Sequence, residues 1–117
     1  MRYLLFICTD TEPDPATDDY PEVDEWFEGH RAAGVHVLGE RLRPAPEART
    51  VRVRGGERLV TDGPFAETRE RIVGFDLIEC DNMEQALEVA AGHPMAYGGR
   101  IEVRELWPFE PEPVEEG

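Results

Sequence analysis

The segment 61–70, Thr-Asp-Gly-Pro-Phe-Ala-Glu-Thr-Arg-Glu, holds the most distinctive set of chemically capable residues in the chain. Asp62 and Gly63 predict a tight turn, because Gly63 can adopt a positive φ and Pro64 then fixes the direction of exit. Asp62 has two roles open to it: an Asx turn that holds the loop, or a general base or polar anchor at the mouth of a cavity. The second role requires partial burial, which raises the pKa of a carboxyl group.

Further candidate side chains follow this turn. Phe65 supplies an apolar anchor, and Glu67 and Arg69 either pair with each other or bind a substrate. All three are therefore candidate substrate-binding residues.

Asp76 interrupts an otherwise apolar strand predicted over residues 72–80, and Arg104 belongs to a last strand in which charged and apolar residues alternate. If both strands line one cavity between subunits, its interior is charged, which is costly unless it is wet, paired or filled by a ligand. Asp76 and Arg104 are thus either substrate-binding residues or members of structural ion pairs across a dimer.

Residue types that are missing exclude several reactions. The chain has no serine and no lysine, so a serine nucleophile and a lysine Schiff base are impossible. Cys8 and Cys80 lie in apolar runs without metal-ligand spacing, so neither a zinc site nor a disulfide is predicted. We expect a site with neither a metal nor an organic cofactor.

Composition predicts one globular domain. The 117 residues are 40% hydrophobic and carry a formal net charge of −14. That charge argues against nucleic acid and against an anionic membrane as partners, since both need a basic surface. No stretch approaches the ~20 apolar residues of a membrane span, and we expect a cytoplasmic protein.

Hydrophobic periodicity predicts two strand–helix–strand halves with a hairpin between them. The first helix, starting near Asp19 and stopped by Gly34, places Val23, Trp26, Phe27 and His30 on one face. The second helix is predicted to have Asp81 as its N-cap and a buried stripe of Met83, Ala86, Leu87, Ala90 and Ala91. Strands are predicted over 3–8, 35–38, 72–80 and 100–106, a hairpin over 50–60, and a loop over 39–48.

This order is a ferredoxin-like βαββαβ arrangement of the α+β class, with the hairpin inserted before the third sheet strand and the helices on one face. In strand order 4-1-3-2 the first and third strands are antiparallel, so Cys8 and Cys80 should lie at opposite ends of the sheet. The first strand is apolar on both faces, and a second copy of the chain is the simplest cover for the open face. We therefore expect a homodimer that encloses a cavity.

The order Asp-Gly-Pro-Phe-Ala-Glu-Thr-Arg-Glu resembles the DGPF motif of the YCII-related family. Residues 1–6, 34–42, 93–94 and 99–104 resemble the family pattern in the same order. The resemblance implies a YCII-related domain over 1–107, followed by a Pro/Glu-rich C-terminal tail over 108–117. It also implies the fold of a dimeric α+β barrel.

The resemblance further implies a His-Asp pair, with the Asp just after the first strand and the His early on the first helix. Asp10 occupies the first place, whereas the helix carries Glu22 or Val23 where the family has His. His30, two turns later on the same face, is either a substitute catalytic residue or a core histidine.

Two functions remain open from the sequence. By its resemblance, the chain binds or transforms a small polar or aromatic molecule in the cavity of a homodimer, as isomerases, lyases and cofactor-free monooxygenases of the wider superfamily do. The alternative is a non-catalytic accessory or regulatory protein. The resemblance implies it because DGPF-type proteins look like proteins that commonly accompany extracytoplasmic-function sigma factors.

Overall fold

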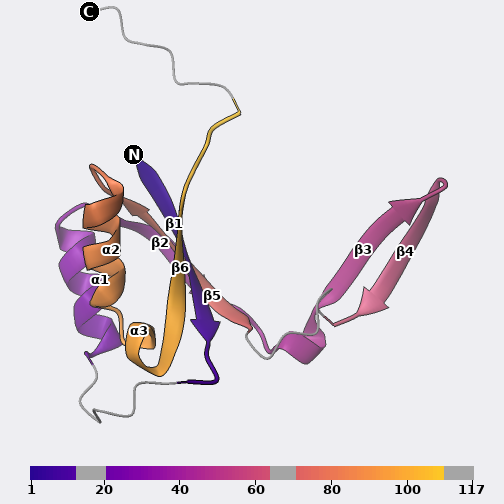
Figure 1. Cartoon of the computed structure of the whole chain (residues 1–117), viewed down its shortest axis with the longest axis horizontal. Coiled ribbons are helices and arrows are strands. Elements are labelled where there is room, and N and C mark those ends of the chain that lie inside the picture. Colours follow the sequence, from indigo (N-terminus) through magenta and orange to yellow (C-terminus); the bar gives the residue numbers. More distant parts are fainter. Residues whose placement is uncertain (13–20, 64–70, 110–117) are drawn as a thin grey trace, which may run out of the picture.

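The computed structural model describes residues 1–12, 21–63 and 71–109 (Figure 1). Within them the chain forms a four-stranded sheet, a separate two-stranded ribbon and three α-helices. The elements in chain order are β1 (Arg2–Thr9), α1 (Val23–Ala32), β2 (His36–Arg41), the 3-10 turn η1 (Ala45–Glu47), β3 (Arg49–Arg54), β4 (Glu57–Asp62), β5 (Ile72–Glu79), α2 (Met83–Ala91), α3 (Met95–Gly98) and β6 (Gly99–Glu105).

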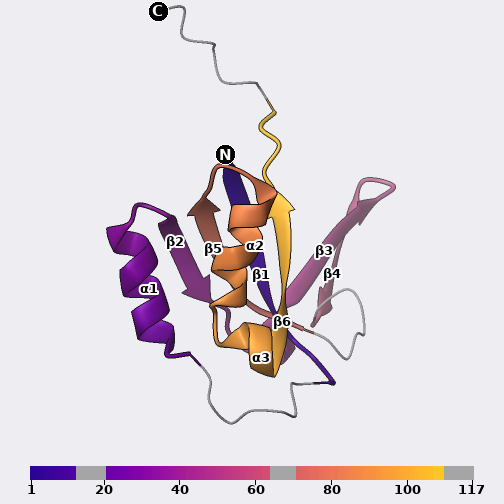
Figure 2. The ribbon, with the colours of Figure 1, turned by 60° about the vertical axis from the view of Figure 1, so that its left-hand side comes forward.

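The main sheet has the strand order β2-β5-β1-β6, and every neighbouring pair is antiparallel. This is the order predicted for a ferredoxin-like α+β fold, so that prediction is confirmed. Figures 1 and 2 show α1 and α2 together on one face of the sheet, with the ribbon β3–β4 projecting away from it. The sheet therefore has one covered face and one face that no described helix covers.

The central strand β1 shows this difference in its alternation. Tyr3, Leu5 and Ile7 are buried and belong to the hydrophobic core beneath the helices. Leu4 and Phe6 point to the opposite face, as alternate residues of a strand must, and are only partly buried. In the neighbouring strand their cross-strand partners are Leu77 and Phe75. The open face thus carries a patch of large apolar side chains.

Helix α2 begins one residue later than its sequence motif suggested. The Asn82 side chain accepts a hydrogen bond from the Gln85 amide at 2.9 Å, and the Gln85 side chain accepts one from the Asp81 amide at 2.7 Å. The prediction of Asp81 as N-cap is therefore wrong. As in a capping box, two side-chain oxygens accept from backbone amides at the helix start, but they belong to Asn82 and Gln85. The amide that Gln85 binds is that of Asp81, one residue before the cap.

The predicted buried stripe of α2 is wrong in part for a related reason. Ala86 and Ala90 are buried as expected, and Val89 is buried with them. The other three predicted members, Met83, Leu87 and Ala91, are exposed. The helix turns its small residues toward the sheet, which lets it approach closely.

Three other boundaries differ from the sequence prediction. Helix α1 begins at Val23 rather than near Asp19, and it ends as predicted before Gly34, which has φ 73°. Strand β2 continues through Arg41 in place of the predicted loop from Gly39, because this stretch pairs with β5. The short helix α3 was not predicted.

The cysteines lie as the predicted strand order requires. Cys8 pairs with Ile72 at the start of β5, whereas Cys80 follows the other end of that strand. Both thiols are free, and burial raises the pKa of each. The expected absence of a bridge between them is confirmed.

Candidate functional site

The most unusual feature beneath the helices is a carboxylate in the apolar core. Asp76 of β5 is 2% exposed, and its Oδ1 lies 2.9 Å from Nε2 of His36, a buried residue of β2. Nδ1 of His36 has no hydrogen-bond partner among the described residues. A proton on Nδ1 would be a buried donor without an acceptor, so the geometry favours the tautomer that donates from Nε2 to Asp76. His36 therefore fixes one oxygen of the carboxylate.

A second imidazole faces the other oxygen. His93, which is 5% exposed, follows the C-terminal end of α2. Its Nδ1 accepts a hydrogen bond from the Met95 amide at 3.0 Å, and its Nε2 lies 3.9 Å from Oδ2 of Asp76. Burial lowers the pKa of His93, and the opposing effect of the Asp76 charge is smaller. His93 is thus a neutral ring whose remaining proton sits on Nε2 and points toward Asp76.

Gly39 makes room for this arrangement. It lies directly opposite Asp76 in the pairing of β2 with β5. A Cβ atom at this position would collide with Oδ1 of Asp76 and would lie 3.0 Å from Nε2 of His36. Strand interiors usually disfavour glycine, and here its missing side chain admits the carboxylate and the imidazole.

Aromatic rings enclose the two histidines. The Trp26 ring centroid lies 4.8 Å from that of His93 and 5.7 Å from that of His36, and Phe27 lies 4.8 Å from His36. All three contacts are edge-to-face. The Trp26 indole also donates to the Val89 carbonyl at 2.8 Å, which ties α1 to α2. The histidines are therefore held in place by packing as well as by hydrogen bonds.

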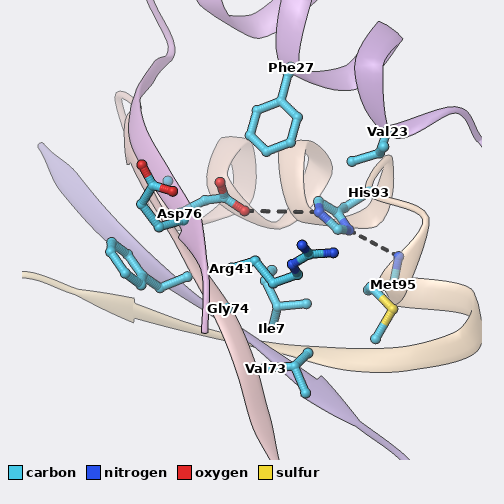
Figure 3. A pocket seen from close by; sticks show the side chains of 12 residues that line it. Ile7, Val23, Phe27, Arg41, Val73, Gly74, Asp76, His93 and Met95 are labelled. Carbon is cyan, nitrogen blue, oxygen red and sulfur yellow. Dashed lines mark hydrogen bonds and ion pairs between the residues drawn. The ribbon is translucent and has the colours of Figure 1, made fainter. Parts of the chain in front are cut away.

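A cavity of about 480 Å³ opens beside Asp76 and His93 (Figure 3). Its walls come from β1, α1, β2, β5, the segment that follows α2 and the start of α3. They are mostly apolar, and Figure 3 shows the guanidinium of Arg41 pointing into the cavity. The lining residues are Ile7, Val23, Phe27, Gly39, Glu40, Arg41, Val73, Gly74, Phe75, Asp76, His93 and Met95.

Oδ2 of Asp76 and Nε2 of His93 thus present an acceptor and a donor to the same cavity. The 3.9 Å between these two atoms exceeds a hydrogen bond, so neither atom satisfies the other. A polar atom of a bound molecule can contact both. Acceptor and donor at one point are the elements of acid–base chemistry.

Of the candidate site residues that the sequence suggested and the structure describes, only Asp76 lines this cavity. His30 lies close by and is half-buried, with its ring 5.1 Å from Trp26. Burial lowers the pKa of His30, but the residue does not line the cavity. Asp10 accepts a hydrogen bond from the Glu12 amide at 2.8 Å, which is a local turn contact.

The other selected residues lie elsewhere. Asp62 is at the end of the ribbon, where its exposed side chain pairs with Arg49 at 3.1 Å. Arg104 pairs with Leu4, and thus lies on the open face of the sheet, opposite the face that carries Asp76. The expectation that Asp76 and Arg104 line one cavity is therefore wrong. Phe65, Glu67 and Arg69 lie outside the described residues, as does most of the DGPF segment.

Sequence reasoning missed His36 and His93. The predicted strand order already placed the strand of His36 beside that of Asp76, so the pair could have been found from the sheet register. His93 gave a weaker signal, because its position depends on the unpredicted turn into α3. It is one of only three histidines in the chain, and the fold brings all three around Trp26.

Two classes of site receive no support from the described part of the chain. It contains no group of three or more His, Cys, Asp or Glu side chains placed to hold a metal ion. In residues 1–12, 21–63 and 71–109, no helix is long and apolar enough to cross a membrane.

Comparison with known proteins gives a family match that extends over nearly the whole chain. The YCII-related domain matches residues 1–110. The chain belongs to the YCII-related domain family. A similar curated protein, from Rhizobium meliloti (strain 1021), is described as uncharacterised and is 44% identical over 73 residues. The aligned part is 61% of this chain and 59% of the length of the Rhizobium protein.

Proposed function

We propose that this YCII-related protein binds a small, partly apolar molecule in the Asp76 cavity and moves a proton on it. The observation that carries the proposal is the arrangement of the carboxylate. Its Oδ1 is held by His36 at 2.9 Å, while its Oδ2 faces His93 across 3.9 Å at the cavity wall. A cavity of about 480 Å³ with few, convergent polar groups is typical of small-molecule sites.

The two polar groups suit proton abstraction next to a carbonyl group. Asp76 Oδ2 accepts the proton from the carbon, and the electron pair of the broken C–H bond forms a carbon–carbon double bond. The carbonyl π electrons move onto oxygen, which accepts a hydrogen bond from Nε2–H of His93. A neutral imidazole is the right donor here, because its pKa is lowered by burial and it keeps its proton through the reaction. Return of the proton to carbon or to oxygen completes an isomerisation without a redox partner.

Deuterium exchange tests this proposal directly. Benzyl methyl ketone is incubated with the protein in D₂O, and loss of its acidic C–H signals is followed by proton NMR. We expect wild-type protein to accelerate exchange over buffer, and Asp76→Asn to slow it by roughly 10²–10⁴-fold, the usual contribution of a general base. His93→Phe, which removes the donor but leaves the base, should slow exchange as well.

The matched control is Asp62→Asn, the same chemical change at an exposed carboxylate on the ribbon. It should exchange the ketone at the wild-type rate. Circular dichroism of each variant establishes that its fold is intact. Wild-type exchange no faster than buffer, or equal rates in wild type and folded Asp76→Asn, would refute the proposed role of Asp76.

We also propose that the open sheet face packs against a second copy of the chain. The support is the patch of Leu4, Phe6, Phe75 and Leu77, which no described helix covers. Asp76 itself lies on the other face, opposite the buried Leu5, and of this patch only Phe75 lines the cavity, so the proposed proton transfer uses groups of one chain. Sedimentation of the wild type and of Phe6→Glu tests the dimer, since a charge in the patch should yield single chains. The regulatory hypothesis stays a prediction, and no described feature favours it.

A further inference from the structure

A second hollow, of about 820 Å³, adjoins the Asp76 cavity at the end of the sheet where β1 and β2 finish and β5 begins. The two spaces share Arg41 and Val73 as lining residues. The two spaces are therefore neighbours at this end of the sheet. The second hollow is lined by Thr9, residues 41–45 and residues 71–73.

The charge of this second hollow is opposite to that of the chain. Its described lining includes three arginines, Arg41, Arg43 and Arg71, and no acidic residue. The whole chain carries a net charge of −14, so most of its surface repels anions. A hollow that collects three guanidinium groups in such a chain is a local exception.

The arginines differ in whether their charge is compensated. Arg43 is paired with Glu47 at 3.0 Å. Within the described residues, neither Arg41 nor Arg71 forms an ion pair. The backbone amide of Arg71 donates to Oγ1 of Thr9 at 2.9 Å, which holds the start of β5 against the end of β1. Among the described residues, that contact leaves the Thr9 hydroxyl proton and the guanidinium groups of Arg41 and Arg71 without an acceptor at one end of the sheet.

We infer that Arg41 and Arg71 bind the anionic head of an elongated ligand whose apolar body lies in the Asp76 cavity. Guanidinium groups bind carboxylates and phosphates through paired hydrogen bonds, so the head is one of these two groups. The body meets Ile7, Phe27 and Met95, which favour a hydrocarbon or aromatic portion. This inference rests on the proposed function for the position of the body, and it names the substrate class as small organic anions.

The test compares three probes that share one aromatic ring: benzoate, phenyl phosphate and uncharged benzamide. Each is titrated into ¹⁵N-labelled protein, and the shifts of the amides of Arg41, Arg71 and His93 give its affinity. At least one anion should bind ~10-fold or more tightly than benzamide, because hydrogen bonds to charged groups are the stronger ones. The tighter anion distinguishes a carboxylate head from a phosphate head.

Arg41→Gln and Arg71→Gln should each weaken binding of the preferred anion by ~10-fold and leave benzamide binding unchanged. The control is Arg58→Gln, which removes an arginine from the exposed ribbon and should bind all three probes as wild type does. Equal affinity for benzamide and the anions, wild-type anion binding in both cavity variants, or no shift with any probe would overturn the inference.

This outcome is separable from that of the proposed function. Exchange of the uncharged benzyl methyl ketone requires Asp76 and no anionic head, so it is measured independently of anion binding, and the ribbon variant Arg58→Gln should exchange the ketone at the wild-type rate. If Asp76→Asn abolishes ketone exchange while the anions bind no better than benzamide, the anion site is refuted and the proposed function stands. If the anions bind through Arg41 but no ketone exchange occurs, the anion site stands and the proposed proton transfer at Asp76 is refuted.

Discussion

Substitution of Gly39 by alanine is the smallest change that should disrupt the candidate site. The added Cβ would occupy the position of Asp76 Oδ1 and would also crowd Nε2 of His36. The carboxylate must then move away from His36, and the hydrogen bond of 2.9 Å between them is lost. The strand backbone cannot yield instead without breaking the pairing of β2 with β5.

The expected cost follows from these two effects. Losing a hydrogen bond to a charged group costs ~1.5–3 kcal/mol, and overpacking a filled core costs a further ~1–3 kcal/mol. Because relaxation relieves both together, we expect a loss of about 3 kcal/mol in the free energy of unfolding. A domain of this size is usually stable by only ~5–15 kcal/mol, so the loss should be easy to measure.

Urea unfolding followed by circular dichroism measures the effect. With a denaturant slope of ~1–3 kcal/mol per molar urea, the unfolding midpoint should fall by roughly 1–3 M. The control is Gly29→Ala in α1, where an added Cβ meets no atom within 4 Å. The same chemical change should there stabilise the protein by ~0.5–1 kcal/mol, since alanine favours a helix. Equal midpoints for Gly39→Ala and wild type would refute the account of the site.

Three further predictions concern the cap, the histidines and the thiols. Asn82→Ala should lower the free energy of unfolding by ~1 kcal/mol, because the Asn82 side chain caps α2, and Asp81→Ala should hardly change it. A larger loss for Asp81→Ala than for Asn82→Ala in urea unfolding would contradict this assignment of the cap. Burial lowers the pKa values of His93 and His30, so below about pH 6.5 the unfolded chain binds more protons than the folded chain. The free energy of unfolding should therefore have its full value above that pH and should fall as the pH is lowered through the folded-state pKa values. His93→Gln should flatten that fall in thermal unfolding scans, and an unchanged pH profile would exclude His93 as a cause. Burial raises the pKa of the Cys80 and Cys8 thiols, so iodoacetamide should label both more slowly in the folded protein at neutral pH than in urea, as mass spectrometry would show.

The fold was predictable because its signals are local and repeated. The apolar run of β1, the glycine stop at Gly34 and the hairpin glycines each imply one element, and their order permits few topologies. Errors arose where two neighbouring residues could perform one task. Asp81 and Asn82 are both good caps, and the choice between them depends on how the helix packs on the sheet.

The site was less predictable because its residues are distant in sequence. Asp76 stood out as a charge in an apolar strand, but its role depends on His36, 40 residues earlier, and on His93 beyond the end of α2. The DGPF segment drew attention to Asp62, which the fold places on the exposed ribbon. Motif order identified the family, whereas the chemistry of the cavity emerged only from the strand register.

The central claim is that Asp76 and His93 present an acceptor and a donor to one cavity, and the protonation of His93 tests it most directly. Long-range ¹H–¹⁵N NMR correlations distinguish the two neutral tautomers of each imidazole from its charged form. At pH 7 we expect His93 to be neutral, with its proton on Nε2 and a bare Nδ1 that accepts from Met95. A charged His93 ring, or one with its proton on Nδ1, would contradict the account.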